Sequence, residues 1–292
     1  MQPYVFVTDS DSDLPYRYVE EYDLTIAYMP YMVDGKEYFD DLGRLGNQKL
    51  FFDSMRAGGT PVTSLLPVEA YLELFEPIYA SGKDILFIAF SSQLSGTIQN
   101  IRTARDELAA KYPDRRLRLV DTLSISAPQS LLILQAAEMY QAGADMDAVA
   151  DWVEQNKLKA QAWFTVDDLK YLKRGGRISS VAAAVGTMLD LKPIITETKE
   201  GKLVSSDKIQ GRKKALRFLA DRAVANIEDP AHCRPIIMQA DAPEDAARLE
   251  AMLYERIPGL QKIETWYVGP VIGAHCGPGT VAICFMGKER PL

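Results

Sequence analysis

Apolar runs of strand length alternate with amphipathic runs of helix length along the first half of the chain. The apolar runs predict strands over residues 4–7, 24–33, 36–39, 85–90 and 116–120. Apolar residues at helical spacing predict helices over residues 14–22, 46–57, 67–81, 98–111, 126–142 and 146–155. Such alternation is typical of an open α/β layer fold, in which ligands bind beyond the carboxyl ends of the strands.

From about residue 159 onward, the pattern changes to hairpins mixed with helices. Strands are predicted over 161–166, 193–198, 201–205, 235–240, 261–268 and 280–286, and helices over 181–191, 212–226 and 244–257. The sequence therefore predicts an α/β protein of two domains: an N-terminal open α/β layer domain, residues 1–158, and a C-terminal α+β domain with a mixed sheet, residues 159–292. No low-complexity linker separates them, so the boundary is soft and the domains are expected to be in close contact.

The stretch from Asp84 to Thr97, DILFIAFSSQLSGT, leads from an apolar strand through a hydroxyl-rich turn into a helix. Backbone N–H groups and the positive end of the helix dipole favour an anion at such a turn, and Gly96 permits a close approach. The turn contains Ser92 and Ser95 but no Lys or Arg, and no P-loop lysine follows it. These features favour a carboxylate over a triphosphate.

A second hydroxyl pair, Thr63 and Ser64, precedes the helix expected over residues 67–81. Taken alone, the pair is most simply a helix N-cap. Two hydroxyl turns at neighbouring strand ends would, however, converge on one carboxylate.

The segment VFVTDSDSD presents Asp9 and Asp11 directly after an apolar strand. This spacing resembles the opening of magnesium-dependent phosphohydrolases, in which an aspartate nucleophile is followed by an acid two residues later. A calcium loop fits poorly, because Leu14 occupies the position that requires glycine. The simpler interpretation is that Asp9 and Asp13 are turn and cap residues.

Two further groups are candidates for binding. His275, one of two histidines, lies in GPVIGAHCGPGT and is expected in a loop between glycine turns. Basic residues cluster in two places, and Arg177 and Arg212 within these clusters are candidates for facing a phosphate or a partner. The alternative is that both clusters are solvated surface.

Composition narrows the classes of function. The chain has 292 residues, of which 33 are basic and 40 acidic, and the formal net charge of −7 argues against a nucleic-acid binder. Three cysteines without a CxxC pair fit a reducing bacterial cytoplasm, and no signal peptide or membrane span is visible. No GxSxG elbow, Walker motif or GxGxxG turn is present, so the chain has no visible means of binding ATP, and no cofactor is expected.

Taken together, the motifs resemble those of the DegV family of bacterial fatty-acid-binding proteins over essentially the whole chain. The matching stretches, in order, are VTDSDSDLP, the Thr63-Ser64 turn, SSQLSGT, VDT, DDLKYLKRGGRIS, LKPIIT and GPVIGAHCGPGT. No one stretch is decisive, and the combination in this order and spacing is highly specific.

The resemblance implies two domains with one long-chain fatty acid, such as palmitate, between them. It implies that Thr63 and Ser95 hold the carboxylate, with His275 near that end and Ser64, Ser92 and Gly96 as secondary candidates. It also implies a non-catalytic subunit that presents the fatty acid to a separate ATP-binding fatty acid kinase subunit, giving an acyl phosphate for phospholipid synthesis. The apolar helices expected over 181–191 and 130–137 are candidate walls, and transient contact with a membrane is compatible with this role.

One departure from the family pattern bears on the kinase step. The family's KVRxxKKA segment reads KIQGRKK here, so that Gln210 stands where the family has an arginine, and Arg212 would have to replace it. The alternative function is therefore a lipid carrier or sensor without a kinase partner, and the phosphohydrolase remains a second alternative.

Overall fold

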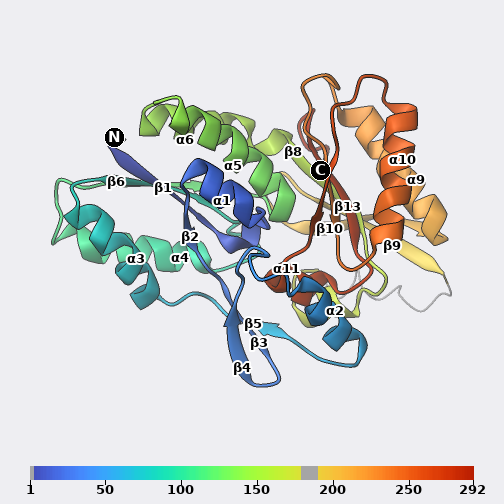
Figure 1. Ribbon diagram of the computed structural model, residues 1–292, viewed down its shortest axis with the longest axis horizontal. Coiled ribbons are helices and arrows are strands. Elements are labelled where there is room, and N and C mark those ends of the chain that lie inside the picture. Colours follow the sequence, from blue (N-terminus) through green and yellow to red (C-terminus); the bar gives the residue numbers. More distant parts are fainter. Residues whose placement is uncertain (1–2, 179–189) are drawn as a thin grey trace.

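The computed structural model describes residues 3–178 and 190–292 (Figure 1). The helix expected over residues 181–191 lies outside the described residues as far as 189. Leu191 itself begins a strand, β9 (Leu191–Glu197), so the expected helix cannot extend to that residue.

A four-stranded parallel sheet is built from the first 121 residues. Its strand order is β2 (Thr25–Ala27), β1 (Tyr4–Asp9), β6 (Asp84–Ala89) and β7 (Leu117–Asp121). Residues 85–89 of β6 are all fully buried, because helices cover both faces of a parallel sheet. On one face lie α3 (Val68–Ala80) and α4 (Thr97–Ala109); on the other lie α1 (Tyr16–Tyr22), α5 (Ser126–Gln141) and α6 (Met146–Asn156).

A six-stranded mixed sheet is built from residues beyond 159. Its order is β10 (Leu203–Gln210), β9, β8 (Ala160–Thr165), β13 (Val281–Met286), β11 (Ile236–Gln239) and β12 (Glu264–Tyr267), and only the β11–β12 pair is parallel. Helices α9 (Arg212–Asn226) and α10 (Pro243–Arg256) pack on its outer face, and α5 contacts β8 and β13 on its inner face (Figure 1). The predicted α/β class with a mixed second sheet is confirmed. The domain boundary at residue 158 stays a prediction; it falls in a short 3-10 helix, Lys157–Lys159.

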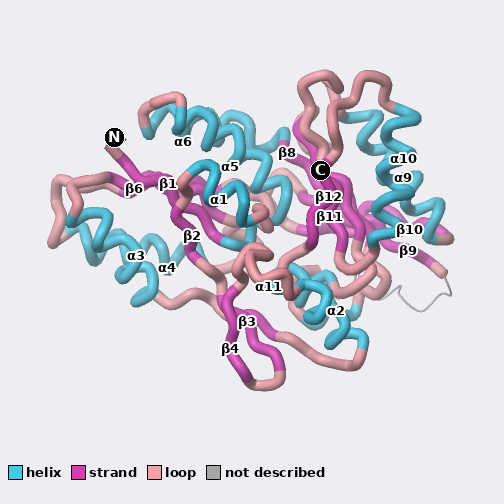
Figure 2. The backbone as a smooth tube through the Cα atoms, viewed as in Figure 1, coloured by secondary structure: helices cyan, strands magenta, loops and turns pink. Residues whose placement is uncertain are grey.

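A small antiparallel sheet projects from the parallel one and differs from the prediction. Its order is β4 (Lys36–Phe39), β3 (Pro30–Val33) and β5 (Val62–Thr63), and it packs beside α2 (Gln48–Arg56) (Figure 2). The single strand expected over residues 24–33 is wrong, because β2 and β3 belong to different sheets. Pro30 has no N–H to donate to a continuing ladder, which explains a break at this residue.

The segment around His275 also differs from the prediction. It is a helix, α11 (Pro270–Cys276), rather than a loop. Pro270 occupies the first turn, where its missing N–H costs nothing, and Gly277 ends the helix with φ +78°. Gly273 has no side chain because a Cβ there would lie 2.8 Å from Phe52 Cζ of α2. A 3-10 turn, Ser10–Ser12, and the short helix α7 (Lys170–Arg174) complete the elements that surround the site.

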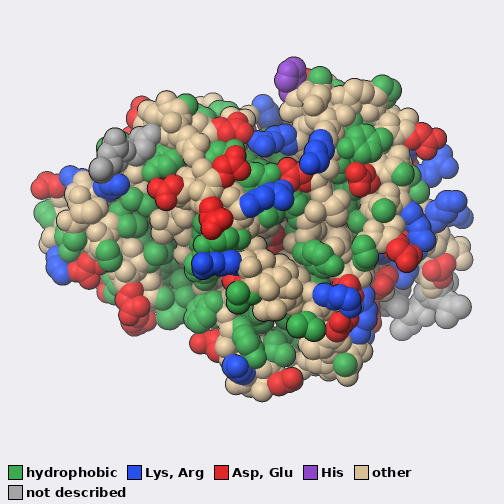
Figure 3. Space-filling model, viewed as in Figure 1, with side chains coloured by type: hydrophobic (Ala, Val, Ile, Leu, Met, Phe, Trp, Pro, Cys, Tyr) green, Lys and Arg blue, Asp and Glu red, His purple; other side chains and the backbone are tan. Residues whose placement is uncertain are grey.

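Acidic and basic side chains are interspersed over the face shown in Figure 3, without a continuous basic stripe. Within the described part of the chain, no helix is long and apolar enough to cross a membrane.

Candidate functional site

A cavity of about 150 Å³ lies between the parallel sheet and the mixed sheet. A cavity that holds a single water needs only about 10–15 Å³, so this cavity is much larger than an ordinary packing defect. Polar side chains line one part of it: Asp11, Thr63, Ser64, Ser95, Ser126, Arg177, His275 and Thr280. Apolar residues form most of the remainder, including Met29, Leu94, Phe164, Leu172, Met238, Val268 and Cys284.

Thr63 and His275 meet at this cavity although they are far apart in the sequence. Thr63 ends β5, where pairing with Tyr31 of β3 fixes its position, and His275 lies in the last turn of α11. The Thr63 Oγ1 and His275 Nε2 atoms are 2.9 Å apart and share a hydrogen bond. Burial lowers the pKa of His275 to about 4, and the positive charges of Arg177 and Arg174 add to this effect. The imidazole is therefore neutral near pH 7, and its Nδ1 is buried without a hydrogen-bond partner.

Ser95 lies at the start of α4, on the opposite side of the hydroxyl turn from β6. Its Oγ is 2.8 Å from Thr97 Oγ1 and accepts a hydrogen bond from the Thr97 N–H at 3.3 Å. Ser95 also lines the cavity. Thr63, Ser95 and His275 thus all line one cavity. That they hold a carboxylate there stays a prediction.

Arg177 adds a positive charge that the hydroxyl turns lack. Its Nε donates to the Leu94 carbonyl at 3.1 Å, and its guanidinium also reaches the Gly175 carbonyl. The side chain lines the cavity and is half-buried, and burial lowers its pKa, with the Asp11 charge opposing. The neighbouring Lys173 and Arg174 are exposed, so only Arg177 of this basic cluster turns inward.

Buried acids lie beside the polar end of the cavity. Asp9 is fully buried, and its two oxygens accept hydrogen bonds from the Phe90 N–H (2.8 Å) and from Gln129 Nε2 (3.0 Å). Burial raises the pKa of Asp9 to about 6 despite these bonds. Asp11 lines the cavity, and burial followed by the Asp9 charge raises its pKa well above the usual range. Within the described ranges, no three His, Cys, Asp or Glu side chains are grouped so that they could hold a metal ion.

Asp13 and Asp40 hold the start of the helix that carries His275. The Gly269 N–H donates to Asp13 Oδ1 at 2.9 Å, and a Cβ on Gly269 would lie only 2.5 Å from Asp40 Oδ2. Burial raises the pKa of Asp13 to about 7, against the hydrogen bonds from Ser126 and Gly269. Burial also raises the pKa of Asp40 well above its usual range, and the Asp13 charge adds to the rise. Asp13 therefore holds Gly269, the N-cap residue of α11. The expectation that Asp13 or Ser12 caps the helix over residues 14–22 is wrong, because Pro15 is the N-cap residue of α1.

The remaining candidates lie in different places. Ser64 lines the cavity beside Thr63. Ser92 faces away from it, with its N–H bonded to Asp121, and Gly96 is the N-cap residue of α4, packed against Leu65. Arg212 is outside the cavity: its Nε donates to Asp245 Oδ2 at 2.7 Å, and it also bonds the Gly279 carbonyl.

Most of the apolar lining was not identifiable from the sequence. Residues such as Met238 on β11 and Cys284 on β13 alternate with core residues on the same strands, and periodicity alone cannot separate a cavity wall from a core. The expected wall over residues 130–137 does not line the cavity. Only Ser126 and Pro128 of α5 do so, whereas residues 131–134, 136 and 137 pack in the core.

Comparisons with known proteins agree on one family. A family model described as an uncharacterised protein of the DegV family matches residues 4–288. A DegV domain-containing protein of Clostridium perfringens is 40% identical over 290 residues, covering 99% of both chains. Another from Streptococcus pyogenes is 33% identical over 291 residues, covering 98% of this chain and 99% of that one.

Solved structures give the same result at the level of the fold. A structure described as fatty acid binding of a DegV family protein from Thermus thermophilus matches with a TM-score of 0.85 and 28% identity, over 98% of this chain and all of that one. The structure of DegV, described as a fatty acid binding protein from Bacillus subtilis, matches with a TM-score of 0.82 and 26% identity, over 99% of this chain and all of that one.

Proposed function

This chain belongs to the DegV family, and we propose that it binds one long-chain fatty acid in the cavity between its two sheets. In this proposal, Thr63, Ser95 and His275 hold the carboxylate, and the apolar lining holds the acyl chain. The observation that carries the proposal is that these three polar side chains line the same cavity as a mostly apolar wall. Family members of solved structure are described as fatty acid binding proteins.

The carboxylate and the acyl chain of the fatty acid would contribute to binding in different ways. A buried carboxylate is costly unless it is hydrogen-bonded, and charge-assisted bonds from hydroxyls contribute about 1.5–3 kcal/mol each. Arg177, half-buried at the same end, supplies positive charge without a direct partner among the buried acids. Each buried methylene contributes about 0.8 kcal/mol, so the tail supplies most of the affinity.

We propose further that the protein is not itself an enzyme and acts in the cytoplasm. The chain contains no nucleotide-binding motif, and its three cysteines are free and buried. A separate ATP-binding kinase subunit would reach the carboxylate from the side of Ser64 and Leu65, which are both exposed at the cavity.

The alternative of a lipid carrier or sensor without a kinase partner is favoured by one observation. Gln210 is exposed where the family has an arginine, and Arg212 is engaged by Asp245 and lies 3.6 Å from Asp167. Arg212 is therefore poorly placed to substitute for that arginine. Mixing the protein with an ATP-binding fatty acid kinase subunit and measuring acyl phosphate separates the two functions, and a gain of activity in Gln210→Arg would identify the missing contact.

The phosphohydrolase alternative has less support. Asp9 is fully buried and does not line the cavity, so its carboxylate is not placed to attack a phosphate ester bound there. The acids nearby do not form a group suited to magnesium within residues 3–178 and 190–292.

Native mass spectrometry of the purified protein tests the main proposal. We expect one co-purified acyl chain per protein, or uptake of one palmitate or oleate after delipidation. The paired variant Thr63→Ala with Ser95→Ala should lose most of this uptake. A wild-type protein that neither retains nor takes up a fatty acid would refute the proposed function.

A further inference from the structure

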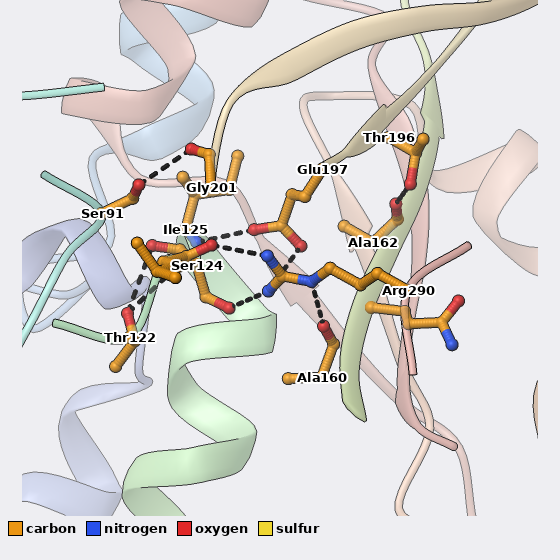
Figure 4. Close-up of polar contacts among 12 residues, drawn as sticks. Ser91, Thr122, Ser124, Ile125, Ala160, Ala162, Thr196, Glu197, Gly201 and Arg290 are labelled. Atoms are coloured by element: carbon orange, nitrogen blue, oxygen red, sulfur yellow. Dashed lines mark hydrogen bonds and ion pairs between the residues drawn. The ribbon is translucent and has the colours of Figure 1, made fainter. Parts of the chain in front are cut away.

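A buried ion pair joins the two sheets behind the cavity wall. Arg290, which follows β13, and Glu197, which ends β9, are each 1% exposed, and Arg290 Nη2 lies 3.4 Å from Glu197 Oε2 (Figure 4). Arg290 Nε donates to the Ala160 carbonyl at 2.8 Å, and Nη1 donates to the Thr198 carbonyl at 3.1 Å. These contacts anchor the guanidinium in the part of the chain that forms the mixed sheet.

The same guanidinium also binds the loop that connects β7 to α5. Arg290 Nη1 donates to the Leu123 carbonyl at 2.6 Å, and Nη2 donates to Ser124 Oγ. Glu197 Oε1 accepts a hydrogen bond from the Ile125 N–H at 3.0 Å. Three consecutive residues of the loop are therefore held by one buried pair.

This loop has a conformation that needs outside support. Leu123 and Ser126 have φ values of +52° and +49°, in the left-handed region that non-glycine residues rarely adopt. Such a backbone persists only where its surroundings fix it. Two residues of the loop, Ile125 and Ser126, line the cavity, so the loop conformation shapes the wall.

The loop in turn supports the hydroxyl turn. The Ser91 N–H donates to the Ser124 carbonyl at 3.0 Å, and the Ser95 N–H donates to the Ser91 carbonyl at 3.3 Å. Ser91 Oγ donates to the Gly201 carbonyl at 2.8 Å, which ties the turn to the β9–β10 hairpin. Gly201, with φ +85°, is needed here because a Cβ would lie 2.5 Å from Ser91 Oγ.

We infer that Arg290 and Glu197 are positioning residues for the ligand carboxylate: the pair fixes the loop over residues 122–126, and through that loop it fixes the turn that carries Ser95. The inference rests on the proposed fatty acid site. It assigns the pair an effect on recognition of the carboxylate in addition to its effect on stability, because the hydrogen bonds continue from the loop through the Ser91 backbone to Ser95.

The test compares two ligands with the same tail, palmitate and hexadecanol. Arg290→Lys keeps the charge but cannot reproduce the fork of donors, and Glu197→Gln keeps the shape but removes the charge. In each variant we expect palmitate affinity to fall about tenfold, the scale of one charge-assisted hydrogen bond, and hexadecanol affinity to change less than about threefold. The matched control is Arg234→Lys, because Arg234 also joins the two halves, through an exposed ion pair in which its Nη1 lies 2.7 Å from Glu138 Oε1. The palmitate-to-hexadecanol affinity ratio of this variant should equal that of the wild type.

An equal loss of affinity for both ligands, or no loss of affinity for palmitate, would overturn the inference. Should either variant fail to fold, Ser124→Ala decides the matter, since it removes the Oγ that accepts a hydrogen bond from Arg290 Nη2; the palmitate-to-hexadecanol affinity ratio must still fall, and an unchanged ratio refutes the role. A wild-type protein that binds neither ligand overturns the proposed function and this inference together. Wild-type binding with an unchanged ratio in the variants overturns this inference alone.

Discussion

Each of the two proposed carboxylate hydroxyls already has a neutral hydrogen-bonding partner. Thr63 is paired with His275, and Ser95 is paired with Thr97. These partners hold the hydroxyls in place, and each oxygen can rotate its proton toward a carboxylate, which accepts a stronger, charge-assisted bond. The site is thus arranged before the ligand enters, which reduces the entropy lost on binding.

Removing either hydroxyl should weaken palmitate binding measurably. Thr63→Val keeps the side-chain shape and Ser95→Ala removes one atom, and we expect each to lower affinity by about tenfold to a hundredfold, corresponding to about 1.5–3 kcal/mol for one charge-assisted bond. Titration calorimetry with delipidated protein measures the change. The control is Thr103→Val on α4, whose hydroxyl bonds only the Gln99 carbonyl. Wild-type affinity in both variants would contradict the assignment.

Asp13 should make stability depend on pH in a defined direction. Its pKa is raised to about 7 in the folded protein, from 3.8, so the folded state binds the proton more tightly than the unfolded state. The contribution of this group is fully present below about pH 4 and is lost as the pH rises through about 7. Asp13→Asn cannot titrate, so the unfolding free energy of the wild type should fall relative to the variant across that range. Urea unfolding at several pH values measures the difference, and a constant difference would show that Asp13 titrates normally.

At the level of elements, α7 and α11 pack closely where Gly175, which follows α7, lies against His275 of α11. Gly175, just after α7, has an ordinary φ of −73°, but a Cβ there would lie 2.1 Å from His275 Nδ1. The absence of a side chain at this position leaves room for the imidazole, which is the hydrogen-bond partner of Thr63.

Gly175→Ala should displace the imidazole and weaken palmitate binding about tenfold, the scale of one lost charge-assisted bond. Because the backbone conformation suits alanine, the loss comes from His275 and not from strain in α7. A double-mutant cycle with His275→Ala tests this cause, since Gly175→Ala should cost little further affinity once the ring is gone. Additive losses in the double variant would contradict it.

Elements with strong local patterns were predictable from the sequence, and elements defined by tertiary contacts were not. The apolar run in β6 is buried on both faces, so its pattern is unambiguous. The two-residue strand β5 has no periodicity of its own and is specified by pairing with β3. The start of α11 contacts Asp13 and Asp40, which lie more than 200 residues earlier in the chain.

The candidate site shows the same division. Thr63, Ser95 and His275 were singled out from the sequence because hydroxyls gather near Gly96, histidine is rare in this chain, and the motifs around all three resemble those of the family. The inward direction of Arg177 was not predictable, because exposed and buried arginines look the same in a basic cluster. Arg290 was missed altogether, since a single arginine beyond the last predicted strand carries no local signal of burial.

At the scale of the whole molecule, a ligand bound in the cavity should also increase the free energy of unfolding. Its lining comes from both sheets, so a bound acyl chain replaces solvent-facing apolar surface in both halves with packed contacts. A ligand that binds only the folded state adds about 2.7 kcal/mol at a free concentration one hundred times its Kd.

Palmitate should therefore raise the melting temperature of the delipidated protein by several degrees, as expected for about 2.7 kcal/mol in a domain of this size. Differential scanning calorimetry with and without palmitate measures the shift. The paired variant Thr63→Val with Ser95→Ala should show a smaller shift at the same palmitate concentration. An identical shift in that variant would indicate that the fatty acid binds elsewhere.

The position of Arg290 in the chain also bears on when the protein becomes competent to bind. Arg290 follows every strand of both sheets, so on the ribosome all of them are synthesised before this residue. Until it arrives, Glu197 has no buried counter-charge, and the loop over residues 122–126 lacks the groups that hold its left-handed residues. The parallel sheet can thus assemble before the Ser95 turn is set, whereas the mixed sheet cannot, because its middle strand β13 ends only at Met286. In the proposed site, capture of a fatty acid by its carboxylate therefore requires a chain that has been synthesised at least as far as Arg290.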